Sequence, residues 1–315
     1  MAERMEPGLV SAVLPVHNGA RWLRQAIDSV LGQTYPAVEI VTVDDGSTDE
    51  SFELLSGYGG PVRPYRQKNC GSVGLVRNAA IERSRGEFLA FLDQDDWWLP
   101  GKLARQVAMM RSDAQIELVH TAVRHFDDAS GDECPPLNPF SRPEQISGDC
   151  FEELLLGNPI YNSSVLVRRE AVDQVGMCDP ANPGNTVQDY DLWLRIAAKC
   201  RCGFVAEQLT TYRLHRAQGM RDRRAMLRAE LGVLLRIRGE AWWRSDPRGR
   251  KRLASLYDDL AVACLEHREW REARRCFQNA WRLDSTARRM VRYGASRLPG
   301  PMVNAVRSLK CRFGR

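Results

Sequence analysis

Three short groups of aspartates each follow an apolar run or open a helical pattern. The groups are Asp44 with Asp45, Asp93 with Asp95 and Asp96, and Asp189 with Asp191. Carboxylates brought together repel one another unless a cation or hydrogen-bond donors offset their charge. Mg²⁺ and Mn²⁺ take oxygen ligands of this kind, commonly together with the phosphates of a substrate. Aspartates also form turns and cap helices, but their recurrence in three such groups favours a binding site.

The elements that must position these groups alternate between strands and helices. Short apolar runs predict strands, and apolar residues at helical spacing, such as Trp22, Ile27 and Val30, predict the helices between them. The predicted strands are Leu9–Val13, Val38–Val43, Pro61–Tyr65 and Glu87–Leu92, and the predicted helices span 22–31 and 74–84. This alternation predicts an α/β fold with a mostly parallel sheet, in which ligands bind beyond the carboxyl ends of the strands.

The middle of the chain is less regular. Four prolines predict a long loop near 127–148. After it we expect a strand at Ser164–Val167, a helix at 191–199 and two extended segments, Gly203–Val205 and Leu209–Leu214. From about residue 219 the pattern is helical and rich in arginine.

Several other classes of protein are excluded by missing signals. The first turn, 15–19, has one glycine, so the G-x-G-x-x-G dinucleotide fingerprint is incomplete, and no Gly-Lys-Ser/Thr follows a glycine-rich loop. No apolar run approaches the ~18 residues of a membrane span, and the first seven residues hold no apolar signal core. Nine cysteines are never spaced C-x-x-C, which predicts reduced thiols and no zinc site. We therefore expect a cytoplasmic protein.

Several linked motifs in residues 9–110 resemble glycosyltransferase family 2. The matching stretches are 10–19 (VSAVLPVHNG), 39–49 (EIVTVDDGSTD), 69–71 (NCG), 77–78 (RN) and 86–96 (GEFLAFLDQDD). A weaker similarity reaches about residue 216 through 163–169 (SSVLVRR), 175–176 (VG), 188–195 (QDYDLWLR) and 212–215 (YRLH). The resemblance implies a GT-A fold, Rossmann-like with helices flanking the sheet, and an inverting transferase that uses nucleotide-diphosphate sugars.

The resemblance also assigns roles to residues of the donor site. It implies a nucleotide pocket lined by Pro15, His17 and Asn18, in which Asp45 accepts a hydrogen bond from uracil or thymine. Arg77 would then lie near the diphosphate, and Asp93 would face the ribose or the sugar. At position 17 the family often has tyrosine, which is a mild change in a pocket wall.

A second set of implied roles concerns the metal and the acceptor. Asp95 would ligate Mn²⁺ or Mg²⁺, and Asp189 would be the catalytic base. His215 is also assigned to the metal. A competing interpretation is that His215 and Arg213 belong to a solvated basic face. The family usually has glutamate where Gln188 precedes the base, so a charge is missing beside Asp189.

Three tryptophans near these motifs have two interpretations. Trp97 and Trp98 follow the acidic motif, where an aromatic ring could stack on a sugar, but packing in the core is favoured for both. Trp193 lies among the apolar residues of the helix at 191–199, so we expect it in the core.

The net charge of +5 hides an asymmetry. Residues 1–212 hold 19 Lys/Arg and 30 Asp/Glu, whereas residues 213–315 hold 26 and 10. We expect two domains: a GT-A domain at 1–218 and a basic helical region at 219–315. Residues 253–284 of the latter resemble one tetratricopeptide hairpin with Ala261 and Ala273 at the helix crossing. The basic and apolar residues of 286–315 suit an anionic membrane surface, or alternatively pair with the acidic domain.

The expected function is sugar transfer from a UDP- or TDP-sugar to a hydroxyl of a saccharide or lipid-linked saccharide, in cell-surface polysaccharide assembly. The expected location is the cytoplasm, peripheral at the inner face of the plasma membrane, and nucleic acid is not expected as a partner. Two alternatives remain: transfer to a polyprenyl phosphate, and a non-catalytic scaffold built on a degenerate transferase domain. The presence of Asp95 and Asp189 weighs against degeneracy.

Overall fold

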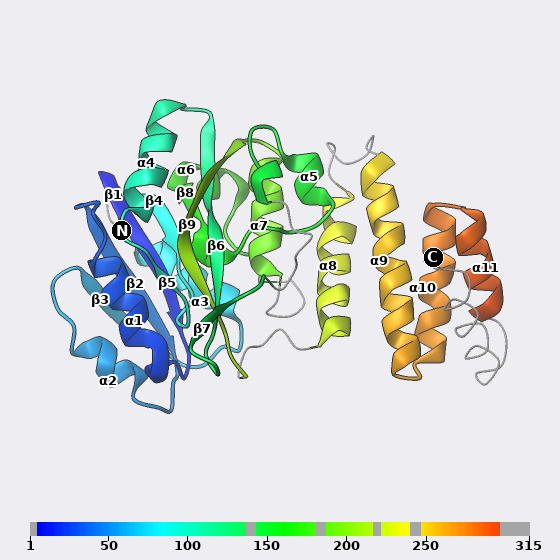
Figure 1. Cartoon of the computed structure of the whole chain (residues 1–315), viewed down its shortest axis with the longest axis horizontal. Coiled ribbons are helices and arrows are strands. Elements are labelled where there is room, and N and C mark those ends of the chain that lie inside the picture. Colours follow the sequence, from blue (N-terminus) through cyan, green and yellow to red (C-terminus); the bar gives the residue numbers. More distant parts are fainter. Residues whose placement is uncertain (1–4, 137–142, 181–186, 217–221, 240–246, 297–315) are drawn as a thin grey trace. The chain divides into compact units, whose positions relative to one another are not determined.

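The computed structural model describes residues 5–136, 143–180, 187–216, 222–239 and 247–296. The described residues form two compact units (Figure 1). The first is an α/β unit whose described residues reach 216, and the second is a helical unit that comprises the described residues from 222 onward together with Val187.

Four parallel strands form the first half of the sheet. They are β1 (Glu6–Val16), β2 (Val38–Asp45), β3 (Val62–Gln67) and β4 (Gly86–Phe91), in the spatial order β3-β2-β1-β4. Because all four run the same way, the residues that follow β1, β2 and β4 emerge at one edge of the sheet. The three loops at this edge are 17–19, 46–50 and 92–96.

The second half of the sheet mixes parallel and antiparallel pairs. Its members are β8 (Leu166–Arg168), β6 (Ile116–Asp127), β9 (Arg201–Leu214) and β5 (Trp97–Trp98), continuing from β4 in that order. β8 is antiparallel to both β4 and β6, whereas β9 is parallel to β6. A short hairpin joins β6 to β7 (Asp132–Cys134).

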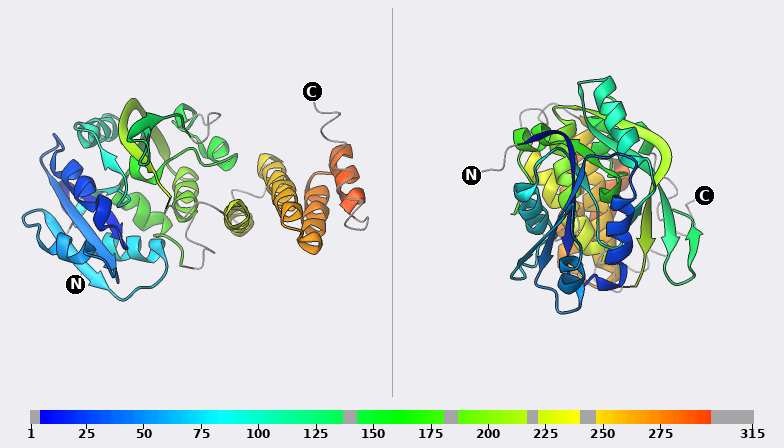
Figure 2. Two further views of the ribbon diagram at one scale, coloured as in Figure 1. Left: turned by 60° about the horizontal axis from the view of Figure 1, so that its bottom comes forward. Right: turned by 90° about the vertical axis from the view of Figure 1, so that its left-hand side faces the viewer.

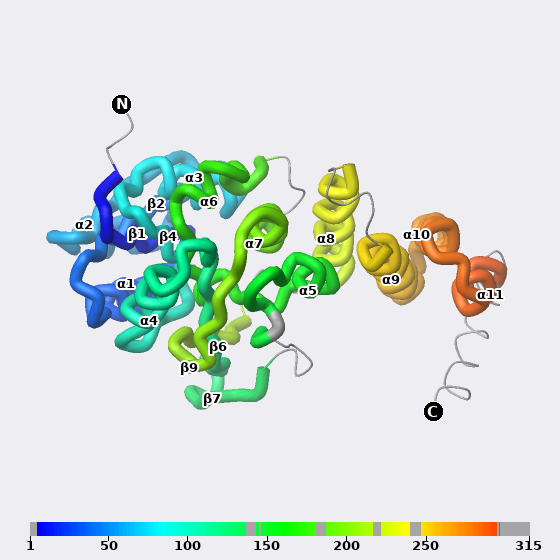
Figure 3. Tube along the Cα trace, turned by 90° about the horizontal axis from the view of Figure 1, so that it is seen from above, coloured from blue at the N-terminus to red at the C-terminus, as the bar shows by residue number. Residues whose placement is uncertain are grey.

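Helices cover both faces of this sheet. Figure 3 shows α1 (Ala20–Leu31) and α4 (Lys102–Ser112) on one side, and α3 (Val73–Arg83) and α6 (Arg169–Val175) on the other. The apolar stripe of α1, including Leu23 and Ile27, is fully buried in one core with Leu14 of β1. The remaining helices of this unit are α2 (Ser51–Ser56), α5 (Phe151–Leu155) and α7 (Gln188–Ala197).

The middle of the chain differs from the sequence-based expectation. The long loop expected near 127–148 contains the β6–β7 hairpin and a 3₁₀ turn at Pro143–Gln145, and residues 137–142 lie outside the described part. The two extended segments expected at 203–205 and 209–214 form one strand, β9, with register shifts opposite Thr121 and Ala122. Those irregularities explain the interrupted apolar pattern, because a bulge breaks the alternation of side chains.

The helical unit contains α8 (Arg223–Ile237), α9 (Pro247–Glu266), α10 (Trp270–Leu283) and α11 (Ala287–Ser296). Each helix packs against the next one along the chain, as Figure 2 shows for α9 to α11. Ala261 and Ala273 are fully buried, so the expected crossing residues lie between α9 and α10. Within the described residues, every helix is too short or too polar to cross a membrane.

Candidate functional site

The loop after β1 is held against the loop after β2. Asn18 has a φ of +50°, and its backbone amide donates to Ser47 Oγ at 2.9 Å. The Asn18 side chain accepts from the Thr48 amide at 2.8 Å, and His17 Nδ1 lies 3.0 Å from the Asp45 carbonyl. His17 and Asn18 are both exposed at the edge of the sheet. Pro15 is buried within β1, where it pairs with Val43 of β2.

The two aspartates that end β2 have different surroundings. Asp45 is nearly buried, and its carboxylate accepts hydrogen bonds from Gln67 Nε2 at 2.8 Å and from the Cys70 amide at 3.0 Å. Asp44 is fully buried and forms an ion pair with Arg66 at 3.2 Å. The Gln67 and Cys70 contacts fix the Asp45 carboxylate, whereas Asp44 organises the turn that follows.

The acidic motif after β4 begins with a carboxylate that is firmly held. Asp93 Oδ1 accepts hydrogen bonds from Arg77 at 2.7 Å and from Asn162 Nδ2 at 3.0 Å, and its side chain remains 30% exposed. Arg77 is buried on α3. Burial alone would lower the pKa of Arg77, but the charge of Asp93, together with Cys178 and Asp189, raises it. Arg77 therefore stays charged beside Asp93.

Asp95 meets the last strand of the sheet. Its Oδ2 lies 2.8 Å from His215 Nε2, and the imidazole packs against the Trp22 ring at 4.1 Å between ring centroids. Arg213 donates to the Asp95 carbonyl at 2.8 Å and also pairs with Asp128 at 2.8 Å. The side chains of His215 and Arg213 are each only 6% exposed, so the interpretation of both as a solvated basic face is wrong.

The side chains at Asp95 suit a divalent cation. A carboxylate oxygen and an imidazole nitrogen 2.8 Å apart form a donor pair that fits a metal such as Mn²⁺. Two protein ligands leave most of the coordination sphere for a substrate phosphate and water. Asp95 and His215 are thus the residues that would hold the ion.

Asp96 points away from this pair into the domain. It is 2% exposed, accepts from Ser163 Oγ at 2.5 Å and from the Arg213 amide at 3.0 Å. Burial raises the pKa of Asp96 well above its usual value, and the Asp95 and Asp93 charges raise it further. The same Ser163 hydroxyl accepts from the Asp93 amide at 3.1 Å. Asp96 therefore stabilises the conformation of the acidic motif through its bonds to Ser163 and Arg213.

Asp189 lies in the first turn of α7. Burial raises the pKa of Asp189, the Arg77 charge and the Tyr190 amide lower it, and Asp93 raises it again. Its neighbour Gln188 donates to Ser72 Oγ at 3.3 Å. Asp191 is fully buried and pairs with Arg195 at 3.0 Å. One arginine, Arg77, is thus electrostatically coupled to both Asp93 and Asp189.

The tryptophans near the motif belong mainly to the core. Trp98 is 2% exposed, and its indole nitrogen donates to the Ser163 carbonyl at 2.7 Å. Trp193 is fully buried. Trp97 is half-buried, with its ring edge-on to Phe126 at 5.2 Å and the Arg213 guanidinium over it at 4.6 Å.

Two residues of the site were not singled out from the sequence. Asn162 donates to Asp93 from a short 3₁₀ turn, and no local motif marks it. Gln94 bonds the backbone of His17, although it lies between the two aspartates of the motif. Its position between Asp93 and Asp95 was a usable signal, but its partner is 77 residues away in sequence.

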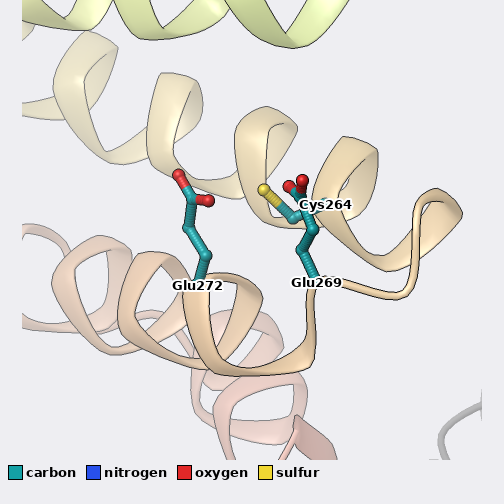
Figure 4. A group of neighbouring side chains, drawn as sticks. All are labelled: Cys264, Glu269 and Glu272. Carbon is teal, nitrogen blue, oxygen red and sulfur yellow. The ribbon is translucent and has the colours of Figure 1, made fainter.

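A second group of potential metal ligands lies in the helical unit. Cys264, Glu269 and Glu272 converge at the α9–α10 turn (Figure 4). Arg228 of α8 donates to Glu272 at 2.7 Å and to Glu269 at 3.0 Å, and Arg224 donates to Glu269 at 2.8 Å. These guanidinium groups already offset the two carboxylate charges, so the group is an ion-pair network that fastens α8 to the hairpin.

The sequence is similar to those of known glycosyltransferases. The sequence model of glycosyl transferase family 2 matches residues 11–171. An uncharacterised glycosyltransferase of Rickettsia felis is 32% identical over 213 residues, 67% of this chain and 35% of that protein, so this chain spans about a third of the relative's length. TuaG of Bacillus subtilis, a putative teichuronic acid biosynthesis glycosyltransferase, is 31% identical over 65% of this chain and 79% of its own length.

Solved structures share the fold at low sequence identity. The structure of S. aureus TarS 1–349 superposes with a TM-score of 0.67 at 15% identity, covering 91% of this chain and 90% of that one. The mannosyltransferase PcManGT of Pyrobaculum calidifontis, solved with GDP-Man and Mn²⁺, gives a TM-score of 0.60 at 14% identity, covering 97% and 81%. These likenesses concern the fold alone. Since the family match spans more than half of the sequence, the chain belongs to glycosyl transferase family 2, is a glycosyltransferase and has the GT-A fold.

Proposed function

We propose that this glycosyltransferase moves a sugar from a UDP- or TDP-sugar to a hydroxyl of a saccharide or lipid-linked saccharide, with inversion at the anomeric carbon. The observation that carries the proposal is Arg77, which is bonded to Asp93 and electrostatically coupled to Asp189. The guanidinium of Arg77 thus interacts with a carboxylate on the proposed donor side, Asp93, and with one on the proposed acceptor side, Asp189. The name of TuaG, a putative teichuronic acid biosynthesis glycosyltransferase, supports a role in cell-surface polysaccharide assembly, and a TarS structure with UDP-GlcNAc supports a UDP-sugar donor.

The donor end of the site would bind the nucleotide through the loops after β1 and β2. The Asp45 carboxylate, held by Gln67 and Cys70, would accept the N–H of a uracil or thymine ring. His17 and Asn18 are exposed beside it and would form one wall, with buried Pro15 supporting that wall from β1. Arg77 would lie near the diphosphate, and because it is bonded to Asp93 it would also act on the sugar side through that carboxylate.

Asp95 and His215 would hold the cation, Mn²⁺ or Mg²⁺. When bound, a divalent cation offsets the charge of the departing diphosphate and orients it. This chain contributes the converging carboxylate and imidazole, and Asp96, Ser163 and Arg213 keep the Asp95 backbone in place. PcManGT was solved with Mn²⁺, which supports a metal requirement.

Asp189 would act as the general base that takes the proton of the acceptor hydroxyl. A raised pKa suits this role, because a base is most effective when its pKa approaches the working pH. The nearby Arg77 charge opposes the rise in the pKa of Asp189 and so favours the ionised carboxylate. Direct attack by the activated hydroxyl needs no enzyme nucleophile and inverts the anomeric centre.

Two alternatives remain for the acceptor and for catalysis. A polyprenyl phosphate acceptor brings its own negative oxygen and would not need a base, so turnover would survive the loss of Asp189. A non-catalytic scaffold would neither bind nor consume a donor. Metal-dependent hydrolysis of UDP-sugars would exclude the scaffold. Turnover with a hydroxyl acceptor and with a phosphate acceptor, measured in the wild type and in Asp189→Asn, separates the polyprenyl phosphate alternative from the proposal.

The helical region, 219–315, is proposed as a separate domain that brings the enzyme to an anionic membrane from the cytoplasmic side. Residues 286–315 interleave basic and apolar side chains, and 297–315 of them lie outside the described part. Arg289 and Arg292 of that stretch pair with Asp258 of α9. The outer face of α10 gives further support, since Arg271, Arg275 and Arg282 are exposed there on one side of the helix.

The test of the proposed function is metal-dependent nucleotide binding. Calorimetry should show that UDP or TDP binds with Mn²⁺ and far more weakly with EDTA, and Asp95→Asn should remove most of that difference. The matched control is Asp113→Asn at the end of α4, where a half-exposed carboxylate pairs with Arg201 on the surface. Equal nucleotide affinity with and without EDTA would show that the metal assignment is wrong.

A further inference from the structure

Gln94 forms a two-way pairing with the backbone of His17. The His17 amide donates to Gln94 Oε1 at 2.8 Å, and Gln94 Nε2 donates to the His17 carbonyl at 3.0 Å. One side-chain amide therefore satisfies both backbone groups of an exposed residue. This is the pattern of a strand pair, made by a side chain from a loop 77 residues further along the chain.

Gly19 provides the space that this pairing needs. A Cβ at position 19 would lie 2.3 Å from Gln94 Oε1 and 2.5 Å from its Cδ, closer than atoms can approach. The φ of Gly19 is −111°, which any residue can adopt. The requirement for glycine at this position is thus the room for the Gln94 side chain and not an unusual backbone angle.

The pairing connects the acidic motif to the loop after β1, which in turn contacts the loop after β2. Gln94 lies between Asp93 and Asp95, so its backbone belongs to the acidic motif. His17 in turn contacts the Asp45 carbonyl, and Asn18 bonds Ser47 and Thr48 of the loop after β2. The Gln94 side chain therefore connects the acidic motif to the loop that would form a wall of the nucleotide pocket.

We propose that Gln94 is a positioning residue that holds the loop 15–19 in its nucleotide-binding conformation and couples it to the Asp93–Asp95 motif. This inference rests on the proposed function of the site. Asn18 has a positive φ, which costs a non-glycine residue energy, so the loop keeps this conformation through its bonds to Ser47 and Thr48 and through the Gln94 pairing at the preceding residue. Pre-ordering the loop lowers the entropy lost when the nucleotide binds.

The first experiment needs no ligand. Hydrogen exchange of the His17 amide should become faster in Gln94→Ala by roughly two- to tenfold, the net contribution expected for one hydrogen bond. The matched control is Gln33→Ala, because Gln33 makes the same two-way pairing with the Leu99 carbonyl and the Leu103 amide, outside the site. Gln33→Ala should leave exchange at His17 unchanged. Unchanged exchange in Gln94→Ala would overturn the inference.

The second experiment tests the steric argument with UDP as the probe, in one buffer that contains Mn²⁺ at the same concentration for every variant. Gly19→Ala should weaken UDP binding about as much as Gln94→Ala, on the order of tenfold for two lost hydrogen bonds. The double variant should be no weaker than either single variant, because the methyl group then has room. Additive losses would overturn the inference, and thermal denaturation of each variant checks that it is folded.

The two experiments separate failure of the coupling from failure of the proposed donor. If the wild-type protein does not bind UDP, the donor assignment is wrong, whereas the exchange result still decides the role of Gln94. If UDP binds and Gln94→Ala changes neither exchange nor affinity, the donor assignment stands and the positioning role is wrong. A KM for the donor that rises in Gln94→Ala with unchanged kcat would agree with positioning.

Discussion

At the scale of single residues, Arg77 connects two carboxylates that the proposed reaction uses differently. It donates to Asp93 at 2.7 Å, and its charge opposes the rise in the pKa of Asp189 that burial causes. Asp93 is thereby held as a hydrogen-bond acceptor, whereas Asp189 remains available to bind a proton. The environment, and not the residue type, distinguishes the two roles.

The residue-scale prediction concerns Asp189. Asp189→Asn keeps the shape of the side chain but cannot accept the acceptor proton, so turnover should fall about 10²–10⁴-fold. Donor binding should stay within a small factor of the wild-type value, because Asp189 is assigned to the acceptor side. Initial rates and calorimetry with UDP measure the two quantities.

The control for this prediction is Asp191→Asn. Asp191 is buried and pairs with Arg195, which also donates to the carbonyls of Val175 and Gly176. Its loss should lower the free energy of unfolding by roughly 1–3 kcal/mol and change turnover little. Near-normal turnover in Asp189→Asn would remove the general-base assignment and favour a phosphate acceptor.

At the scale of elements, β6 carries a buried histidine that makes the sheet sensitive to acid. His120 is 1% exposed, and Nε2 lies 2.9 Å from the Ile146 carbonyl, whereas Nδ1 is buried without a partner among the described residues. Burial lowers the pKa of His120 from 6.5 to about 4. A proton on Nδ1 would leave a buried charge with no acceptor.

The element-scale prediction follows from the sign of that shift. Because the folded state disfavours the charged ring, its contribution to stability is complete above pH 6.5, declines as the pH falls toward 4 and is lost below that. The full contribution is about 3 kcal/mol at most. Urea unfolding of wild type and His120→Gln at pH 7, 6, 5 and 4 should therefore show converging stabilities as the pH falls. Parallel curves for the two proteins would contradict it.

The sequence predicts elements well where burial is continuous. The strands β1, β2 and β4 are mostly apolar and buried over most of their length, and the helix at 22–31 has a full apolar stripe, so their positions were predicted within a few residues. β6 was not predicted. It mixes polar residues such as Thr121, Arg124 and His125 with apolar ones, and their burial depends on β9 and the aromatic residues near it.

The site was predictable to the extent that its residues lie at strand ends. Asp45, Asp93 and Asp95 follow apolar runs, which places them at one edge of a parallel sheet. Gln94 and Asn162 were missed because their roles exist only through partners 77 and 69 residues away. The burial of Arg213 was missed for the same reason, since Asp128 is 85 residues from it.

At the scale of the whole molecule, basic residues gather in the helical unit. Within α10, Arg271, Arg274, Arg275 and Arg282 are exposed, whereas the acidic Glu272 is engaged by Arg228. Arginines four residues apart on a helix repel one another. An anionic surface would relieve that repulsion, and each arginine near such a surface contributes about 1 kcal/mol, reduced by salt.

The whole-molecule prediction is salt-sensitive membrane binding. The full-length protein should sediment with anionic liposomes at low salt and stay in the supernatant at high salt. Deleting 286–315 should weaken sedimentation, and changing Arg271, Arg275 and Arg282 to Gln should weaken it without removing a packed helix. The matched control changes three exposed cations of the α/β unit, Arg105, Arg111 and Lys199, to Gln. Full-length protein that stays in the supernatant at low salt would contradict the prediction.

The pairing of β6 with β9 has a consequence for how the enzyme is made. The acidic motif leaves the ribosome early, but His215 follows Asp95 by 120 residues, and the Arg213 amide follows Asp96 by 117. At ordinary rates of translation this interval lasts roughly ten seconds. During that time the nascent chain carries the carboxylates without the imidazole and guanidinium that later meet them. The proposed cation site would therefore be completed only when the last strand of the sheet is synthesised, and sugar transfer would wait until the α/β unit has folded.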